Sequence, residues 1–192
     1  MILPKITGVI LAGGRGSRMG HIDKGLQLFR GKPLVAHAIE RLAPQVDELL
    51  INANRNLGEY EKYGYRVIAD SIEGFPGPLA GFECGLAAAT SELVVTAPCD
   101  SPFLPADLVS RLMAVMEKNN AGLAVAKTGD QLHSVFCLMK RSVLPSLRAY
   151  LRAGERKIDL WHEVLQVVIV NFDDEEEAFR NINTLEEKNA LE

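Results

Sequence analysis

The stretch Ile6–Gly20 reads ITGVILAGGRGSRMG and decides the fold of this chain. Its first part, Ile6–Leu11, is a short apolar run of the kind that forms a buried strand. A loop rich in glycine and arginine follows at once. Glycines let backbone N–H groups approach phosphate oxygens, and ligands of open α/β sheets bind where the strands end. The stretch therefore predicts the first strand of an α/β sheet with an anion-binding loop at its carboxyl end.

Spacing excludes two common phosphate-binding loops. A Walker A loop has Lys and then Ser or Thr directly after its last glycine, whereas His21-Ile22 follows Gly20. A dinucleotide-binding loop has a third glycine where this chain has Met19. It also needs an acid at the end of the second strand, which here ends in Asn52–Asn54. The loop therefore belongs to neither class.

Positive charge accompanies the loop. Arg18 and Lys24 lie within about a dozen residues of Gly13 and Gly14 and can neutralise the charge of a triphosphate, the arginine through a bidentate fork. We expect Arg18 and Lys24 to be catalytic and the two glycines to contact the nucleotide. A flexible turn without a ligand is the alternative, and the clustered cations argue against it.

The composition is that of an ordinary globular protein. The chain has 192 residues and is 47% hydrophobic, enough to bury a core without disulfides or a structural metal. Its net charge of −4 argues against nucleic acid as a partner. No apolar run approaches the ~20 residues of a membrane span. Three cysteines without a CxxC pair are typical of a reduced protein, so we expect a cytoplasmic location and no membrane partner.

Apolar runs that fit strands alternate with stretches that fit helices. The strand-like runs are Ile6–Leu11, Glu48–Ala53, Tyr65–Ala69, Glu92–Ala97, Ala121–Lys127, Leu132–Lys140 and Val167–Val170. Helices are expected from Pro33, near Leu57–Lys62, over Pro78–Ala89 and from Pro105. This order predicts a Rossmann-like three-layer α/β/α fold with a mainly parallel sheet. Thr128-Gly129-Asp130 is a hairpin signal, so we expect one antiparallel strand, and Val167–Val170 as a last central strand.

Two carboxylates are expected directly after strands. Asp100 stands between prolines, and Mg²⁺ is typically held by one or two carboxylates together with substrate phosphates, so Asp100 is the expected metal ligand. Asp70 ends the third strand, where an ionised carboxylate could accept hydrogen bonds from guanine N1–H and N2. Asn52 closes the second strand and could bond the base or the ribose. Each of the three could instead cap a turn.

A larger set of motifs resembles the bacterial molybdenum cofactor guanylyltransferases, in the nucleotidyltransferase superfamily. The matching segments are Leu11–Gly14, Arg18–Gly20, Asp23–Gly25, Asn52–Arg55, Gly77–Gly81, Pro98–Asp100, Ala153–Arg156 and Asn181–Thr184. The glycine loop alone marks only the superfamily, and its combination with Gly77–Gly81 and Asn181–Thr184 is more specific. The likeness covers nearly the whole chain.

This resemblance implies transfer of GMP from MgGTP to the terminal phosphate of molybdopterin, with release of pyrophosphate. It implies one nucleotidyltransferase domain over residues 1–192, with a GTP and Mg²⁺ half at 1–104 and an acceptor half at 105–192. It implies GTP contacts from Leu11, Ala12, Gly13, Gly14, Lys24, Asn52, Asp70 and Asp100. Acceptor contacts are expected from Gly81, Arg156, Lys157, Asn181 and Asn183. It further suggests transient contacts with molybdenum-insertion proteins and molybdoenzymes.

Two positions depart from the family pattern, and two other functions stay open. Ser134 follows His133 where the family usually has Pro, and Leu185 follows Thr184 where it also has Pro. Thr184 and Glu187 still have the spacing of a helix capping box. The alternatives are a guanylyl- or cytidylyltransferase acting on another phosphorylated acceptor, and a non-catalytic module for nucleotide binding or cofactor delivery. The second would be expected to lack a metal carboxylate or a phosphate-binding lysine.

Overall fold

The computed structural model describes residues 4–14, 23–72, 77–184, 187, 190 and 191. Ala12, Gly13 and Gly14, at the start of the glycine loop, are among them. Arg18, which we expect to be catalytic, lies outside the described residues with the rest of the loop from Arg15 to Ile22, and so does Leu185.

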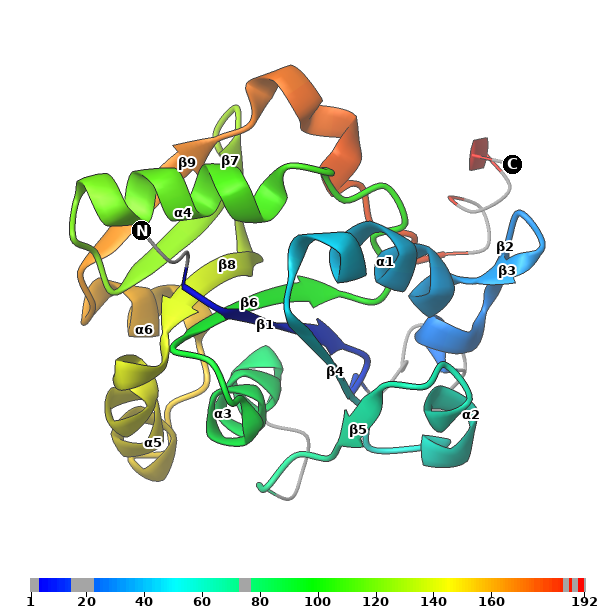
Figure 1. The fold of residues 1–192 in the computed structure, drawn as a ribbon, viewed down its shortest axis with the longest axis horizontal. Coiled ribbons are helices and arrows are strands. Elements are labelled where there is room, and N and C mark those ends of the chain that lie inside the picture. The colour runs from blue at the N-terminus through cyan, green and yellow to red at the C-terminus, as the bar shows by residue number, and fades with distance from the viewer. Residues whose placement is uncertain (1–3, 15–22, 73–76, 185–186, 188–189, 192) are drawn as a thin grey trace.

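A seven-stranded sheet forms the centre of the molecule, in the order β5-β4-β1-β6-β8-β7-β9 (Figure 1). The strands are β1 (Ile6–Leu11), β4 (Glu48–Asn52), β5 (Arg66–Ile68), β6 (Leu93–Pro98), β7 (Leu123–Thr128), β8 (Gln131–Lys140) and β9 (Val167–Asn171). Strand β8 runs antiparallel to both of its neighbours, and the other adjacent pairs are parallel. The prediction of a mainly parallel sheet with one antiparallel strand is confirmed.

Helices cover both faces of the sheet. One face packs against α1 (Leu34–Leu42) and α4 (Leu108–Lys118), the other against α3 (Pro78–Ala88), α5 (Leu144–Arg152) and α6 (Ile158–Glu163) (Figure 1). The short α2 (Leu57–Glu61) precedes β5. Alternate residues of β1 face the two sides, because successive side chains of a strand point in opposite directions: Ile6 and Ile10 belong to the first core, Val9 to the second. No described helix has the length and apolar character needed to cross a membrane.

The prediction that Val167–Val170 is a central strand is wrong. Among the described strands β9 pairs only with β7, so it lies at the edge of the sheet, and Ile169 is 54% exposed. The hairpin of β7 and β8 explains this position. Its second strand pairs with β6, which leaves only the outer side of β7 free to take β9. An apolar run of this length fits either place, so the sequence alone does not distinguish them.

A small hairpin outside the main sheet anchors the end of the chain. Strands β2 (Leu28–Phe29) and β3 (Lys32–Pro33) are joined by Arg30 and Gly31, both with positive φ, as a tight two-residue turn requires. Phe29 and Leu34 form a separate apolar cluster with Ile182. Residues more than 140 positions apart in sequence are thereby held together, near the C-terminus in Figure 1.

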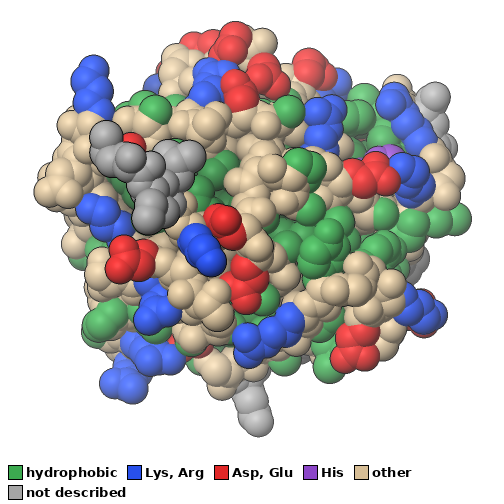
Figure 2. All heavy atoms as spheres, viewed as in Figure 1, with side chains coloured by type: hydrophobic (Ala, Val, Ile, Leu, Met, Phe, Trp, Pro, Cys, Tyr) green, Lys and Arg blue, Asp and Glu red, His purple; other side chains and the backbone are tan. Residues whose placement is uncertain are grey.

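Short 3₁₀ segments complete the chain: η2 (Lys24–Leu26), η3 (Ala43–Gln45), η4 (Arg141–Val143) and η5 (Asp173–Phe179). The acidic side chains of η5 gather at the top of Figure 2, and charges of both signs are interspersed over the rest of that face. Arg111 donates to both carboxylate oxygens of Asp174, at 2.9 and 2.8 Å, and Asp173 accepts the N–H of Gly129 at 2.6 Å. The acidic run therefore ties η5 to α4 and to the β7–β8 turn.

Helix α3 packs closely on β1 because Gly85 has no side chain. A Cβ added there would lie 2.9 Å from a methyl group of Val9, too close without rearrangement. Gly85→Ala should therefore destabilise the protein by about 1–2 kcal/mol, the cost of overpacking less the gain in helix propensity. Gly58, in α2, has open space around it, and Gly58→Ala should stabilise by about 0.5–1 kcal/mol. Urea denaturation measures the free energy of unfolding of both variants. Changes of the same sign and size in the two variants would contradict the close packing of Gly85 on Val9.

Candidate functional site

Four parallel strands end side by side, and backbone hydrogen bonds continue past their ends. The N–H of Ala12 donates to Asn52 O at 2.8 Å, that of Ala53 to Ile68 O at 2.9 Å, and that of Cys99 to Leu11 O at 3.1 Å. The loops that follow these strands therefore leave the sheet together along the carboxyl ends of the strands, and this row of strand ends is the edge meant below. All the residues expected from the sequence to contact GTP lie at this edge: Leu11, Ala12, Gly13, Gly14, Lys24, Asn52, Asp70 and Asp100.

Asp70 lies at one end of this edge, held by two asparagine amides. Asn52 Nδ2 donates to Asp70 Oδ1 and Asn54 Nδ2 to Asp70 Oδ2, each at 2.8 Å. A carboxylate oxygen has two lone pairs, so each oxygen of Asp70 can accept one more hydrogen bond. Asn54 lies within the matching segment Asn52–Arg55, but no role is expected for it from the sequence. Its spacing of two residues from Asn52, just past the same strand, was the available signal.

Two glycines flank the amide of Asn52. A Cβ at Gly13 would lie 3.0 Å from Asn52 Oδ1, and one at Gly81 would lie 2.6 Å from the same oxygen. Any side chain at either position would crowd this amide, so the glycines keep the space beside it open. Gly81, which we expected to contact the acceptor, thus lies against Asn52 and Leu11, two residues expected to contact GTP.

Asp100 and Lys24 form an ion pair at the other end of the edge. Lys24 Nζ lies 3.4 Å from Asp100 Oδ2 and donates to Asn183 Oδ1 at 2.7 Å. Asp100 is only 9% exposed, and its burial raises the pKa of the carboxyl above its ordinary value, although the charge of Lys24 opposes this shift. The carboxylate of Asp100 is thus buried beside an ammonium group that is also held by Asn183.

Lys24 is positioned by the residue before it. Asp23 accepts hydrogen bonds from the hydroxyl of Tyr60 at 2.5 Å and from Asn56 Nδ2 at 3.0 Å. Tyr60 is fully buried, and a Cβ on Gly25 would collide with its hydroxyl group. These contacts fix the start of η2 against α2. Tyr60 is not expected at the site from the sequence, since nothing in its local pattern distinguishes it from an ordinary core residue.

The segment Asn181–Asn183 is bonded to the Asp100 loop. The N–H of Ile182 donates to Asp100 O at 2.9 Å, and the hydroxyl of Ser101 donates to Asn181 Oδ1. The expected capping box is present, because Glu187 N donates to Thr184 Oγ1 at 3.0 Å and Thr184 N to a Glu187 carboxylate oxygen at 3.1 Å. Asn181 and Asn183, assigned to the acceptor from the family resemblance, therefore lie beside the proposed metal ligand.

Arg156 and Lys157 are exposed and lie between α5 and α6. Arg156 Nη1 donates to Leu151 O at 2.8 Å and to Glu155 O at 2.6 Å, which caps the carbonyl end of α5. No hydrogen bond or ion pair between described residues joins either cation to Asp100, Lys24 or the Asn181–Asn183 segment. The acceptor residues expected from sequence thus lie in three places: Gly81 against Asn52, Asn181 and Asn183 beside Asp100, and Arg156 and Lys157 after α5.

Of the two departures from the family pattern, Ser134 is among the described residues and Leu185 is not. Ser134 donates to Asp159 Oδ1 at 2.6 Å and ties β8 to α6. Its neighbour His133 bonds Thr128 Oγ1 at 2.7 Å and stacks on Phe179, and burial lowers the pKa of its ring. Leu185 lies outside the described residues, although the capping bonds of Thr184 are intact.

Two other kinds of site can be set aside. Cys99 is buried, and burial raises the pKa of its thiol well above the ordinary value, so it is no activated nucleophile. Among the described residues, no three or more His, Cys, Asp or Glu side chains cluster as metal ligands would.

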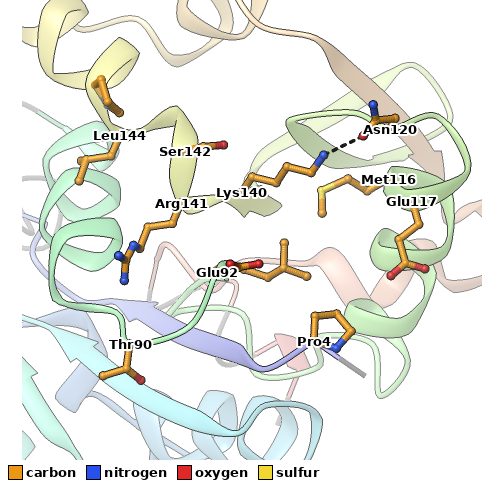
Figure 3. A pocket seen from close by; sticks show the side chains of 12 residues that line it. Pro4, Thr90, Glu92, Met116, Glu117, Asn120, Lys140, Arg141, Ser142 and Leu144 are labelled. Carbon is orange, nitrogen blue, oxygen red and sulfur yellow. Dashed lines mark hydrogen bonds between the residues drawn. The ribbon is translucent and has the colours of Figure 1, made fainter. Parts of the chain in front are cut away.

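A cavity of about 980 Å³ lies at the opposite end of the sheet (Figure 3). Pro4 precedes β1, Leu93 begins β6, and Lys140 ends the antiparallel β8, so these lining residues mark the amino ends of the parallel strands. Lys140 Nζ donates to Asn120 Oδ1 at 3.1 Å and Arg141 Nη1 to Ala89 O at 2.9 Å. Ligands of open α/β sheets bind at the carboxyl ends, so the cavity is no part of the candidate site.

Comparison with known proteins gives concordant matches. The family model of the MobA-like NTP transferase domain matches residues 8–170. A molybdenum cofactor guanylyltransferase of Cupriavidus pinatubonensis is 54% identical over 187 residues, covering 95% of this chain and 94% of that protein. One of Shewanella sediminis is 46% identical, covering 97% and 95%. The crystal structure of molybdopterin-guanine dinucleotide biosynthesis protein A from Archaeoglobus fulgidus has a TM-score of 0.80 at 26% identity, covering 96% and 95% of the two chains.

The raised pKa of Asp100 makes a prediction about stability. The folded state binds the proton of Asp100 more tightly than the unfolded state does. The free energy of unfolding therefore falls as the pH rises from the unfolded pKa of this carboxyl to its folded pKa, and it stays lowered at higher pH. Asp100→Asn should therefore raise the thermal midpoint at neutral pH. The gain should shrink as the pH falls toward the unfolded pKa of about 3.9, where both states are protonated. Calorimetry from pH 3.5 to 7.5 checks this, and a lower midpoint at neutral pH would contradict it.

Proposed function

The chain belongs to the MobA-like NTP transferase family, and on that premise we propose that it transfers GMP from MgGTP to the terminal phosphate of molybdopterin. The products are molybdopterin guanine dinucleotide and pyrophosphate. Relatives named molybdenum cofactor guanylyltransferase, at 46–54% identity over nearly the full length, support the reaction class. The order of side chains along the strand ends is the observation that carries the proposal for this chain.

That order matches the parts of one nucleotide. Asp70 stands two residues past β5, Asn52 ends β4, Gly13 and Gly14 follow β1, and Asp100 stands two residues past β6. The strands lie in the order β5-β4-β1-β6, so three strand spacings of about 4.8 Å, roughly 14 Å, separate the two carboxylates. Base, ribose and phosphates can bridge such a span. We therefore assign the base to Asp70, the sugar to Asn52 and the phosphates to the glycine loop.

Recognition of guanine follows from the state of Asp70. Its two oxygens are held by Asn52 and Asn54 and keep one free lone pair each. Guanine offers two neighbouring donors, N1–H and the N2 amino group, which a carboxylate can accept together. Adenine presents no such pair of donors, so the site favours GTP over ATP.

The metal end is formed by Asp100 with Lys24. Among the described residues, Lys24 Nζ lies between an oxygen of Asp100 and the amide oxygen of Asn183, and Mg²⁺ prefers oxygen ligands of these kinds. Asp100 would hold the ion, which would supply charge neutralisation at the phosphates when bound. Lys24, released from Asp100, would turn to the phosphates. Arg18 is proposed to assist them and lies outside the described residues.

The reaction needs no general base. The acceptor is a phosphate monoester whose second pKa is about 6, so it is largely dianionic at neutral pH and already a nucleophile. Positioning in line with the α-phosphate and stabilisation of the negative charge on the leaving pyrophosphate are what remain for the protein to supply. The cations Lys24 and Arg18 and the backbone of Gly13 and Gly14 are proposed to do this.

The acceptor must approach where the phosphates lie. Asn181 and Asn183 stand beside Asp100, so they are proposed to contact its reacting end, with Gly81 nearby on the nucleotide side. Arg156 and Lys157 are proposed to hold a more distant part of the acceptor. We place the reaction in the cytoplasm and expect transient contacts with molybdenum-insertion proteins and molybdoenzymes, neither nucleic acid nor membrane being a partner.

Product analysis tests the proposed reaction. Incubation with labelled GTP, Mg²⁺ and molybdopterin should yield a labelled dinucleotide and pyrophosphate. Asp100→Ala should slow its formation by at least about 100-fold, a typical cost of losing one transition-state charge contact. CTP, ATP and UTP, and cobinamide phosphate in place of molybdopterin, serve as controls. Efficient transfer to cobinamide phosphate with none to molybdopterin would refute the proposal.

Asp70→Asn should weaken the preference for guanine. The substitution replaces one accepting oxygen with a donor, so it should cost about 1–3 kcal/mol of GTP binding, the usual value of a charge-assisted hydrogen bond. ITP lacks the N2 amino group, and its affinity should fall less. Calorimetric titration of both nucleotides measures the ratio, and an unchanged GTP-to-ITP ratio would count against this role of Asp70.

Arg156→Ala should weaken molybdopterin binding about tenfold and leave GTP affinity unchanged, because Arg156 lies apart from the nucleotide cluster. Arg152→Ala is the matched control, since Arg152 is an exposed arginine in the last turn of α5. Separate titrations with GTP and with molybdopterin measure the affinity of each variant for each ligand. A loss of GTP binding, or no effect on either ligand, would remove Arg156 from the acceptor site.

A further inference from the structure

Asn54 is engaged at every polar atom of its side chain. Its Nδ2 donates to Asp70 Oδ2 at 2.8 Å and to Gly13 O at 3.2 Å, and its Oδ1 accepts the backbone N–H of Asp70 at 2.8 Å. One amide therefore joins the loops that follow β1, β4 and β5. By comparison, the side-chain amide of Asn56, two residues further on, donates to Asp23 Oδ2 at 3.0 Å and reaches neither Gly13 nor Asp70 through a bond between described residues. The hydrogen bonds of the Asn54 side chain therefore fix the relative positions of these three loops.

The bonds between Asn54 and Asp70 are reciprocal and fix an orientation. The amide oxygen of Asn54 holds the main chain of Asp70, while its amide nitrogen holds the carboxylate of the same residue. Two bonds between the same two residues leave the carboxylate little freedom to rotate. Of the bonds that described residues make to this carboxylate, the one from Asn52 to Oδ1 would remain without Asn54, and a carboxylate held at one oxygen can turn about that contact.

Orientation matters because guanine is recognised by two donors at once. Discrimination between GTP and ITP depends on the oxygen that accepts from the N2 amino group, and it is lost when the carboxylate plane turns away. The third bond of Asn54, to Gly13 O, links the same amide to the glycine loop. The position of the base acceptor is thus tied to the start of the proposed phosphate loop.

We propose that Asn54 is a positioning residue for guanine selection, which acts by holding the carboxylate of Asp70 in the plane that accepts N1–H and N2 together. This inference rests on the proposed function, because it presumes that the base lies at Asp70. It adds a determinant of specificity that itself need not touch the nucleotide.

Calorimetric titration with GTP, ITP and ATP in Mg²⁺ buffer, without acceptor, tests the proposal. In Asn54→Ala, the GTP-to-ITP affinity ratio should fall about tenfold, while ATP binding should stay within about twofold of wild type. Asn119→Ala is the matched control, because Asn119 is an exposed asparagine whose side-chain amide donates to Val115 O at the end of α4. A purely structural role would weaken all three nucleotides equally and leave the ratio unchanged, which would overturn the proposal.

A second variant and a double mutant guard against a folding defect. Asn54→Asp keeps the size of the side chain but sets a second carboxylate against Asp70, so the GTP-to-ITP ratio should fall at least as far. If Asn54 acts through Asp70, the Asn54→Ala/Asp70→Asn double mutant should have the ratio of Asp70→Asn alone. Additive losses would overturn the proposal. A wild-type protein without preference for GTP over ATP and ITP would refute the proposed function itself, whereas a wild-type preference that survives both Asn54 variants refutes only this inference.

Discussion

The parallel pairing of β1 with β4 on one side and β6 on the other is the constraint on which the rest of the structure depends. It brings the carboxyl ends of the strands to one edge, where the bonds from Ala12 to Asn52 and from Cys99 to Leu11 hold the following loops in register. Together with the pairing of β4 with β5, it sets Asp70 and Asp100 three strand spacings apart. The pairing of the strands sets the positions of the site residues, and the loops after the strands provide their side chains.

Local pattern predicts what is local and fails where distant segments meet. The strand before the glycine loop, the three-layer fold and the antiparallel hairpin follow from periodicity and turn residues. The edge position of β9 does not, because it depends on which strand of the hairpin pairs with β6. Asp70 and Asp100 could be found as carboxylates after strands. The buried Tyr60 beside Asp23 and the contact of Asn183 with Lys24, 159 residues away, needed the folded chain.

The pair of Lys24 and Asp100 shows how the site carries its charge before any ligand binds. The ammonium group lies between the carboxylate of Asp100 and the amide oxygen of Asn183, so the buried acid has a partner that can leave it. Burial still raises the pKa of Asp100, which means that the folded protein holds this charge at a cost to stability. Such costs are typical of residues kept for function rather than for packing.

The most direct measurement is a crystal structure of the protein with Mn²⁺ and a non-hydrolysable GTP analogue, with the metal located by its anomalous scattering. We expect the metal on the carboxylate of Asp100, guanine against Asp70, and the phosphates over Gly13 and Gly14 between them. We also expect Lys24 to leave Asp100 for the phosphates. Guanine bound away from Asp70, or a metal held without Asp100, would refute this placement of the nucleotide and the metal.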